Sequence, residues 1–272
     1  MYKNVKFLKL GGSLITNKNL PYTVETCTLN RISSEIHDYL STNPDNRLII
    51  GHGSGSFGHT SAALYKTWHG VRTGEDWVGF SKVCHDARSL NQLVTQALIQ
   101  VGVPAISFPP SAQITCTDHR ITRWDTSQIE QSLHYGLVPV VFGDTVLDAN
   151  IGGTILSTEE LFFHLAGIIQ PESILLAGIE AGVWMDFPSR SRLIPLITPG
   201  SYPAQNIHIL ESASPDVTGG MSSKIENMLR LVGDFPQVTI QVFSGIEPWS
   251  VANALNGVQI GTTIRNTERN PS

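Results

Sequence analysis

Short apolar runs alternate along the chain with segments of helical periodicity, and this alternation constrains the fold more than any other feature. The runs expected to form strands are Val5–Leu10, Leu48–Gly51, Val103–Ser107, Leu137–Phe142, Ser173–Ala177, Val238–Phe243 and Val258–Ile264. Continuous apolar strands separated by helices are typical of a mainly parallel sheet covered on both faces. The sequence therefore predicts an α/β protein, with ligands bound beyond the carboxyl ends of the strands.

The segments between the strands repeat apolar residues every three or four positions, which predicts helices. They are Thr28–Leu40, Trp77–Val101, Thr126–Tyr135, Thr158–Ile169, Met221–Val232 and Trp249–Leu255. The stretch Asp186–Gln205 is rich in Ser, Pro and Arg, and its apolar piece Leu193–Ile197 is expected to form a hairpin arm. Because no clean boundary interrupts the pattern, we expect one domain over residues 1–272.

Charge and cysteine usage exclude several classes of protein. The net charge is −5 with no block of Lys or Arg, so no nucleic-acid partner is expected. The longest apolar runs are far too short to cross a bilayer, so no membrane partner is expected either. The scattered Cys27, Cys84 and Cys116 have no metal-binding spacing and indicate reduced thiols in a cytoplasmic protein.

The first expected strand ends in Lys9-Leu10-Gly11-Gly12-Ser13, with Lys18 a few residues further on. Two glycines after a strand let the backbone approach a ligand closely, and successive N–H groups there can bind an anion. The alternative is a tight turn flanked by surface lysines.

The second expected strand leads into a glycine-rich loop, Gly51-His52-Gly53-Ser54-Gly55-Ser56-Phe57-Gly58-His59. Its G-x-G-x-x-G spacing raises a dinucleotide-binding alternative, which requires an acidic residue at the end of the next strand. The corresponding region, residues 70–76, is not a strand end, which disfavours that alternative. A glycine loop that opens a helix remains an anion site, and we expect His59 to contact a bound phosphate. A P-loop is excluded because the chain has no G-x-x-x-x-G-K-[ST].

Two later segments complete the candidate site. Asp144 follows an apolar strand and can orient lysines or hold a metal. The run from Asp216 to Lys224 contains Gly219 and Gly220 at the start of a helix, with Lys224 in its first turn. A lysine at a helix N-terminus is unfavourable with the helix dipole unless a polyphosphate is bound there. Lysines around phosphate loops, positioned by a carboxylate, are what phosphoryl transfer requires.

These motifs together resemble the amino acid kinase superfamily, and G-x-G-x-F-G-H with D-V-T-G-G-M is most similar to its isopentenyl phosphate kinase family. The resemblance spans roughly residues 5–263. It implies an αβα sandwich, usually a homodimer, whose N-terminal part binds the acceptor and whose C-terminal part binds the nucleotide. The implied reaction transfers the γ-phosphoryl group of ATP, with Mg²⁺, to isopentenyl phosphate.

The resemblance also implies roles for individual residues. Lys9 contacts the transferring phosphate, Lys18 stabilises the transition state, and His59 binds the acceptor phosphate. The remaining implied contacts to substrate or nucleotide are Gly11, Gly12, Ser54, Gly55, Thr158, Gly178, Gly182, Gly219, Gly220 and Lys224.

Three departures from the family pattern stand out. Ser54 replaces the middle one of three consecutive glycines, and the family's S-G-D is Ser157-Thr158-Glu159 here. The family's T-D-x-D-G-V is replaced by residues 177–183, which lack both aspartates. The alternatives are therefore a fosfomycin kinase or another small phospho-acceptor kinase, or a non-catalytic nucleotide- or oxyanion-binding relative.

Overall fold

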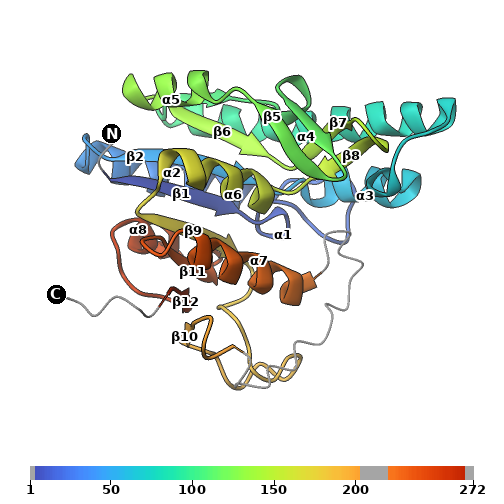
Figure 1. Ribbon diagram of the computed structural model, residues 1–272. Coiled ribbons are helices and arrows are strands. Elements are labelled where there is room, and N and C mark those ends of the chain that lie inside the picture. The colour runs from blue at the N-terminus through green and yellow to red at the C-terminus, as the bar shows by residue number, and fades with distance from the viewer. Residues whose placement is uncertain (1–3, 203–219, 267–272) are drawn as a thin grey trace.

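A computed structural model describes residues 4–202 and 220–266, with the side chains of residues 220–223 left out. Its main feature is an eight-stranded sheet in the order β10-β12-β11-β9-β1-β2-β6-β3 (Figure 1). The strands are β1 (Val5–Leu10), β2 (Arg47–His52), β3 (Ala105–Ser107), β6 (Val138–Phe142), β9 (Ser173–Gly178), β10 (Leu196–Ile197), β11 (Thr239–Ser244) and β12 (Thr262–Ile264). All neighbouring pairs are parallel except β11 with β12. The predicted α/β class with a mainly parallel sheet is confirmed.

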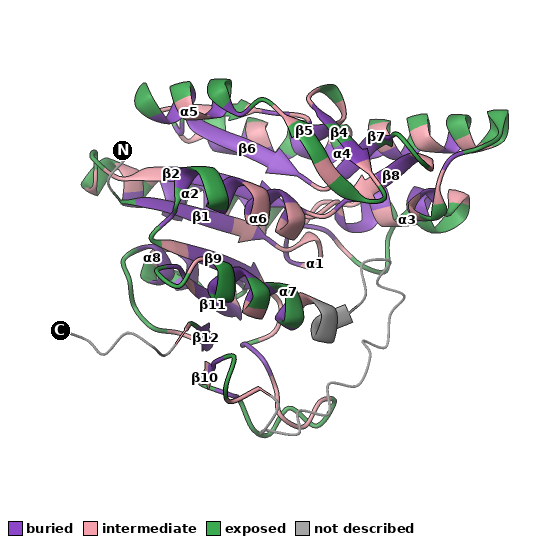
Figure 2. Cartoon of the chain, viewed as in Figure 1, coloured by how far each residue is buried: buried purple, intermediate pink, exposed green. Residues whose placement is uncertain are grey.

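Helices cover both faces of this sheet, as an αβα sandwich requires. One core cluster contains residues of α2 (Thr26–Thr42), α4 (Gly74–Gln100) and α8 (Ser250–Leu255). The other contains residues of α5 (Ser127–His134), α6 (Thr158–Ile169) and α7 (Gly220–Asp234). Figure 2 shows the buried strands between helices whose outer surfaces are exposed.

The alternation of side chains along β1 decides which layer each residue faces. Phe7 belongs to the cluster beneath α6 and α7, whereas Leu8 and Leu10 belong to the cluster beneath α2 and α4. Because side chains alternate between the faces of a strand, Lys9 lies on the same face as Phe7, toward α6.

A second, smaller sheet was not predicted. It has the order β5-β4-β7-β8, with β4 (Ile114–Thr117), β5 (Arg120–Trp124), β7 (Asp144–Asp148) and β8 (Gly152–Leu156). The short helix α1 (Gly12–Ile15) was also missed, whereas α3 (Gly55–Tyr65) begins where the glycine loop was expected to open a helix, although its extent was not predicted. The last strand is shorter than the predicted run from residue 258 to residue 264. No helix in the described part of the chain is long and apolar enough to cross a membrane.

Candidate active site

The glycine turn after β1 packs directly against the glycine loop after β2. Gly11 donates its N–H to the carbonyl of Ala177 in β9 at 2.8 Å. A Cβ on Gly12 would lie only 2.5 Å from the backbone nitrogen of Gly55. Because the two backbones touch where a side chain would otherwise stand, the two predicted anion loops form one surface at the carboxyl ends of β1 and β2.

Thr16 joins the two loops through its hydroxyl. It donates to the carbonyl of Gly12 at 2.7 Å and accepts from the N–H of Ser56 at 2.9 Å. Gly55 has φ +49°, and a Cβ there would lie 2.2 Å from this hydroxyl oxygen. The helix α3 therefore begins against the β1 turn, with the positive end of its dipole at the loop junction.

Lys9 forms a partly buried ion pair with Glu159, the second residue of α6. Burial raises the pKa of Glu159, but the nearby charges of Lys9 and Lys224 lower it by more, so its pKa lies below the usual value. Glu159 thus pairs with Lys9 and also feels the charge of Lys224, two lysines that are far apart in the sequence. Sequence reasoning missed this residue as a positioning carboxylate, although its place in the S-T-E departure from the family motif was a usable signal.

Asp144, predicted to position the lysines, has a different set of partners. It is 1% exposed and accepts hydrogen bonds from the N–H of Thr145 at 2.8 Å and from the hydroxyl and N–H of Ser111 at 2.5 and 3.2 Å. Burial raises the pKa of Asp144 despite these bonds. These hydrogen bonds show that Asp144 holds the segment at Ser111 in place. The carboxylate that pairs with Lys9 is instead that of Glu159.

His59 and Ser54 lie at the beginning of α3, as the glycine loop predicts. Ser54 is the residue before the helix and its carbonyl accepts the N–H groups of Phe57 and Gly58. Its side chain lies over Gly58, where a Cβ would approach within 2.5 Å. His59 follows Gly58 and is partly exposed, one turn from the loop junction.

Thr158, predicted as a substrate contact, is buried beneath the glycine loop. Its hydroxyl donates to the carbonyl of His52 at 2.7 Å, and its methyl group occupies the space where Gly51 has no side chain. In this structure the Thr158 hydroxyl is 1% exposed and has a backbone partner, so its side chain supports the loop, and its contact with substrate stays a prediction.

His52 is a second residue that sequence reasoning missed. The fully buried ring lies with Nδ1 3.0 Å from the carbonyl of Gly53 and Nε2 3.1 Å from the amide nitrogen of Asn91 in α4. Burial lowers the pKa of His52 to about 4, so the ring is neutral at pH 7. Because the Asn91 amide donates to Nε2, the neutral ring carries its proton on Nδ1. Nδ1 then donates to the carbonyl of Gly53 and orients the first peptide of the loop.

Lys18 lies on the other side of the β1 turn, in the connection between α1 and α2. It is exposed and lines a cavity of about 310 Å³ with Ser13, Ile179 and Ile246. Its positive charge also lowers the pKa of Glu180, after the larger effect of a hydrogen bond from Arg190.

On the predicted nucleotide side, the two glycines differ in their surroundings. Gly178 ends β9 and accepts the N–H of Gly245 at 2.8 Å. Gly182 packs against β12, where a Cβ would lie 2.6 Å from the hydroxyl of Thr262. The need for glycine at position 182 is therefore explained by this packing. Gly219 lies outside the described residues, Gly220 is the first residue of α7, and Lys224 is in its first turns.

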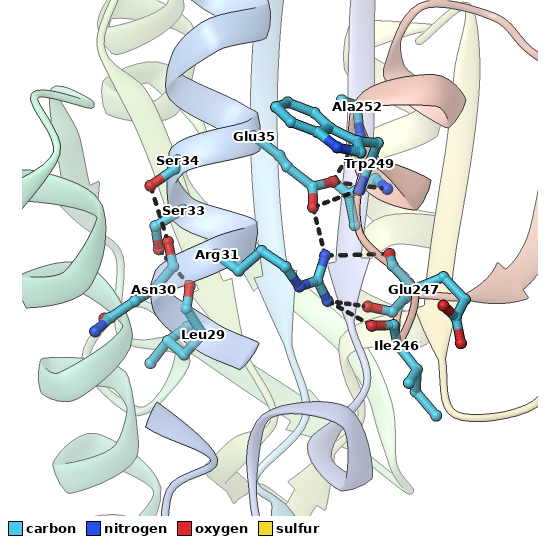
Figure 3. Close-up of polar contacts among 12 residues, drawn as sticks. Leu29, Asn30, Arg31, Ser33, Ser34, Glu35, Ile246, Glu247, Trp249 and Ala252 are labelled. Atoms are coloured by element: carbon cyan, nitrogen blue, oxygen red, sulfur yellow. Dashed lines mark hydrogen bonds and ion pairs between the residues drawn. The ribbon is translucent and has the colours of Figure 1, made fainter. Parts of the chain in front are cut away.

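The loop from Gly245 to α8 is held by an ion pair of α2, Arg31 with Glu35 (Figure 3). The Arg31 guanidinium donates to the carbonyls of Gly245, Ile246 and Glu247. The Glu35 carboxylate accepts the N–H groups of Trp249, Val251 and Ala252 at 2.9–3.0 Å. Arg31 therefore satisfies the carbonyl groups at the start of the loop, and Glu35 satisfies the N–H groups at its end and caps α8. The pair also fixes Ile246, which lines the cavity beside Lys18.

The comparisons with known proteins agree with this geometry. The sequence pattern of the amino acid kinase family matches residues 4–243. Isopentenyl phosphate kinase of Methanothermobacter thermautotrophicus is 34% identical over 94% of this chain and 97% of its own length. Isopentenyl phosphate kinase of Methanocaldococcus jannaschii has the same identity and the same coverage of both chains.

A solved structure described as isopentenyl phosphate kinase superposes with a TM-score of 0.81 at 32% identity, over 96% of this chain and all of the other. The glycine loops, the ion pair of Lys9 with Glu159 and these full-length matches lead to one conclusion. The chain belongs to the amino acid kinase family, among the isopentenyl phosphate kinases.

Proposed function

We propose that this protein transfers the γ-phosphoryl group of ATP to isopentenyl phosphate, which yields isopentenyl diphosphate and ADP. The observation that carries the proposal is the ion pair of Lys9 with Glu159, whose pKa the charge of Lys224 also lowers, beside two interlocked glycine loops. Full-length relatives named isopentenyl phosphate kinase support the choice of acceptor.

The proposed chemistry depends on positioning and charge. The acceptor is a phosphate monoester, whose oxygen is already ionised and nucleophilic at neutral pH, so no general base is needed. Lys9 and the N–H groups of the glycine loops bind the transferring phosphate, and Lys18 stabilises charge that develops in the transition state. One lysine about 4 Å from a phosphoryl oxygen contributes roughly 4 kcal/mol at an effective dielectric constant near 20. His59 binds the acceptor phosphate.

The isoprenoid tail of the acceptor requires an apolar wall, which we assign to the first turns of α4. The rings of Trp77 and Phe80 lie 5.4 Å apart, and Phe80 packs over Gly153 of β8. Trp77 is 39% exposed, so apolar surface remains open to a ligand beside the acceptor loop.

Mg²⁺ belongs to the proposal as the counter-ion of ATP. Among the residues that the structure describes, no group of three or more His, Cys, Asp or Glu side chains could hold a metal. Mg²⁺ in kinases is bound through substrate phosphates, waters and one or two carboxylates, so such a protein cage is not required. When bound, the ion neutralises phosphate charge.

We also propose a single domain over residues 1–272, with the acceptor bound by its N-terminal part and the nucleotide by its C-terminal part. A homodimer in the cytoplasm completes the proposal, on the strength of the family resemblance and the sequence composition.

Product analysis tests the proposed reaction. The protein is incubated with ATP, Mg²⁺ and, in separate reactions, isopentenyl phosphate, dimethylallyl phosphate or fosfomycin, and the products are identified by mass spectrometry. We expect isopentenyl diphosphate and an equal amount of ADP. Phosphorylation of fosfomycin alone would show that fosfomycin, and not isopentenyl phosphate, is the acceptor. ATP binding without ADP formation for any acceptor would indicate a non-catalytic relative.

His59 provides the sharpest variant for this assay. His59→Ala should lose most of the turnover and His59→Asn should retain little, because neither side chain reproduces a positioned imidazole at the acceptor phosphate. His134→Ala is the matched control, since His134 is exposed on α5, away from the glycine loops. Near-wild-type kcat in both His59 variants would remove this residue from the mechanism.

A further inference from the structure

The segment that carries Lys18 is a short hairpin, residues 16–25, which we call the Lys18 loop. Its base is closed by an antiparallel bridge between Thr16 and Val24 and by the N–H of Asn17 donating to the carbonyl of Thr23 at 2.9 Å. Thr16 is also the residue that joins the two glycine loops. The base of the Lys18 loop is therefore fixed to the phosphate-binding surface, and the tip between Lys18 and Tyr22 extends from it.

The tip is fixed at a second point by Tyr22. The phenol hydroxyl donates to the carboxylate of Asp86 in α4 at 3.1 Å, across 64 positions of sequence. The ring of Tyr22 meets that of Phe57 in α3 edge-on, with centroids 5.6 Å apart. The N–H of Tyr22 lies 3.4 Å from the carbonyl of Ser56. Tyr22 thus connects the Lys18 loop to the two helices that follow the acceptor loop.

The backbone of Tyr22 shows that these contacts hold the residue in an unfavourable conformation. Its φ is +54°, a region that bulky residues rarely occupy. Such strain persists only where surrounding contacts determine the conformation, and it is enriched at functional sites.

Asp86 is a specific partner for this hydroxyl. The residue is 2% exposed, and its other oxygen accepts from Lys82, one helical turn away, at 2.5 Å. The Lys82 ammonium group also lies 5.1 Å from the centre of the Tyr22 ring. A buried carboxylate needs such partners, and with Lys82 in place Asp86 stays paired even when the tyrosine hydroxyl is removed.

We propose that Tyr22 and Asp86 are positioning residues for Lys18. They tether the tip of the Lys18 loop to α4, so that the lysine is already in place when acceptor and ATP meet. This inference rests on the proposed function in so far as Lys18 acts in phosphoryl transfer. Without the tether, the hairpin base still forms, but the tip and its lysine sample positions away from the phosphates.

Single-turnover kinetics test the tether through its effect on catalysis. Tyr22→Phe removes only the hydroxyl, and misplacement of a catalytic group lowers the rate constant by about tenfold or more. KM for ATP and for isopentenyl phosphate should change little, because Lys18 contributes in the transition state. In a Lys18→Ala background, Tyr22→Phe should have no further effect. An equal loss in both backgrounds, or none in the wild-type background, would overturn the proposal.

The control variant loses a similar hydrogen bond elsewhere. The hydroxyl of buried Tyr39 accepts from Asn46 at 2.7 Å. Tyr39 lies in the last turn of α2, which leads into the start of β2, so this hydrogen bond lies at the amino ends of the strands. Tyr39→Phe should leave the single-turnover rate constant unchanged. If it slowed turnover as much as Tyr22→Phe does, the effect of Tyr22→Phe would reflect general loosening and the tether would be rejected.

Limited proteolysis gives a readout that does not depend on activity. Trypsin cleaves after Lys18, which is exposed, and opening of the tip should accelerate that cleavage severalfold in Tyr22→Phe and in Asp86→Asn. Cleavage after the exposed Arg190 in the same sample is the internal reference. Unchanged cleavage after Lys18 in both variants would overturn the tether. Accelerated cleavage in a protein that makes no isopentenyl diphosphate would support the tether and reject the proposed function.

Discussion

The loop after β2 and the connection after β9 both leave the carboxyl edge of the sheet, but different forces hold them. The β2 loop is fixed by buried groups, with Gly53 donating to the carbonyl of Leu10 at 3.1 Å and His52 paired on both ring nitrogens. The β9 connection is held by an ion pair between Glu180 and Arg190 at 2.8 Å, whose side chains are 23% and 49% exposed.

The difference bears on how far each segment departs from the family motif, since the β2 loop departs at Ser54 alone and the β9 connection lacks both aspartates. Backbone groups that touch each other leave no room for another side chain, so the glycines of the β2 loop cannot be exchanged without moving the loop. An exposed ion pair contributes little to stability and leaves the sequence free to change. The β2 loop, the proposed acceptor side, is thus built from main chain, and the β9 connection, on the proposed nucleotide side, partly from replaceable side chains.

The largest expected effect would come from adding one methyl group to the β2 loop. Gly55→Ala places a Cβ 2.2 Å from the Thr16 hydroxyl at φ +49°. We expect this variant to lose about 4 kcal/mol of unfolding free energy, from overpacking and left-handed strain together. Urea unfolding measures the loss. Gly74→Ala is the control, because no atom lies within 4 Å of its Cβ position. If the two variants had the same unfolding free energy, the β2 loop would not depend on close backbone packing as described.

Next in size is the effect of removing the charge that pairs with Lys9. Glu159→Gln should lower kcat by about 100-fold, since Lys9 loses its orienting partner and repels Lys224. Glu172→Gln is the matched control, because its pair with Lys6 spans 3.7 Å and its side chain is 59% exposed. A kcat loss of similar size in both variants would show that net charge, rather than position, matters.

Acid should weaken the β2 loop through His52. Its pKa is about 4 when folded and near 6.5 when unfolded, so its stabilising contribution is complete above pH 6.5 and is lost as the pH falls toward 4. When the pH falls from 7.5 to 5, protonation of His52 should lower the free energy of unfolding by about 2 kcal/mol. Urea unfolding of wild type and His52→Gln at both pH values isolates this contribution. If the unfolding free energy of His52→Gln fell between pH 7.5 and pH 5 as much as that of wild type, other groups would be responsible for the acid sensitivity.

The smallest effect is expected at the β9 connection. Arg190→Ala breaks the ion pair with Glu180, yet both partners contact solvent, so the urea midpoint should not change measurably. Trp184, whose indole nitrogen donates to Glu180 at 3.0 Å, still contacts the carboxylate. A loss of stability that approached that of Gly55→Ala would show that both edges depend equally on fixed contacts.

The central sheet could be predicted from the sequence because its strands are buried on both faces and therefore form continuous apolar runs. The second sheet could not, since strands such as Arg120–Trp124 are short and largely exposed, and they show no apolar run. The extent of helix α3 could not be predicted, for a different reason. Its glycines and serines are poor helix formers, and packing against the β1 turn stabilises the helix where intrinsic propensity does not.

The same limits apply to the site. Lys9 and the glycine loops were predictable because each motif is local in sequence. The role of Glu159 was missed, since an acidic residue in the first turn of a helix is ordinary and its partner Lys9 lies 150 positions away; its place in the departure from the family's S-G-D was the one signal that pointed to it. Thr158 was assigned to substrate on the family motif, whereas its burial depends on how α6 packs beneath the β2 loop.

Glu159 also bears on the protein between catalytic cycles. Two ammonium groups brought together for an absent polyanion would repel each other and favour an expanded pocket. With the Glu159 carboxylate paired to Lys9 and under the influence of the Lys224 charge, the three groups carry a formal charge of +1 instead of +2. The resting enzyme can therefore keep its cations assembled while it waits for nucleotide, so little of the binding energy of ATP is needed to gather them.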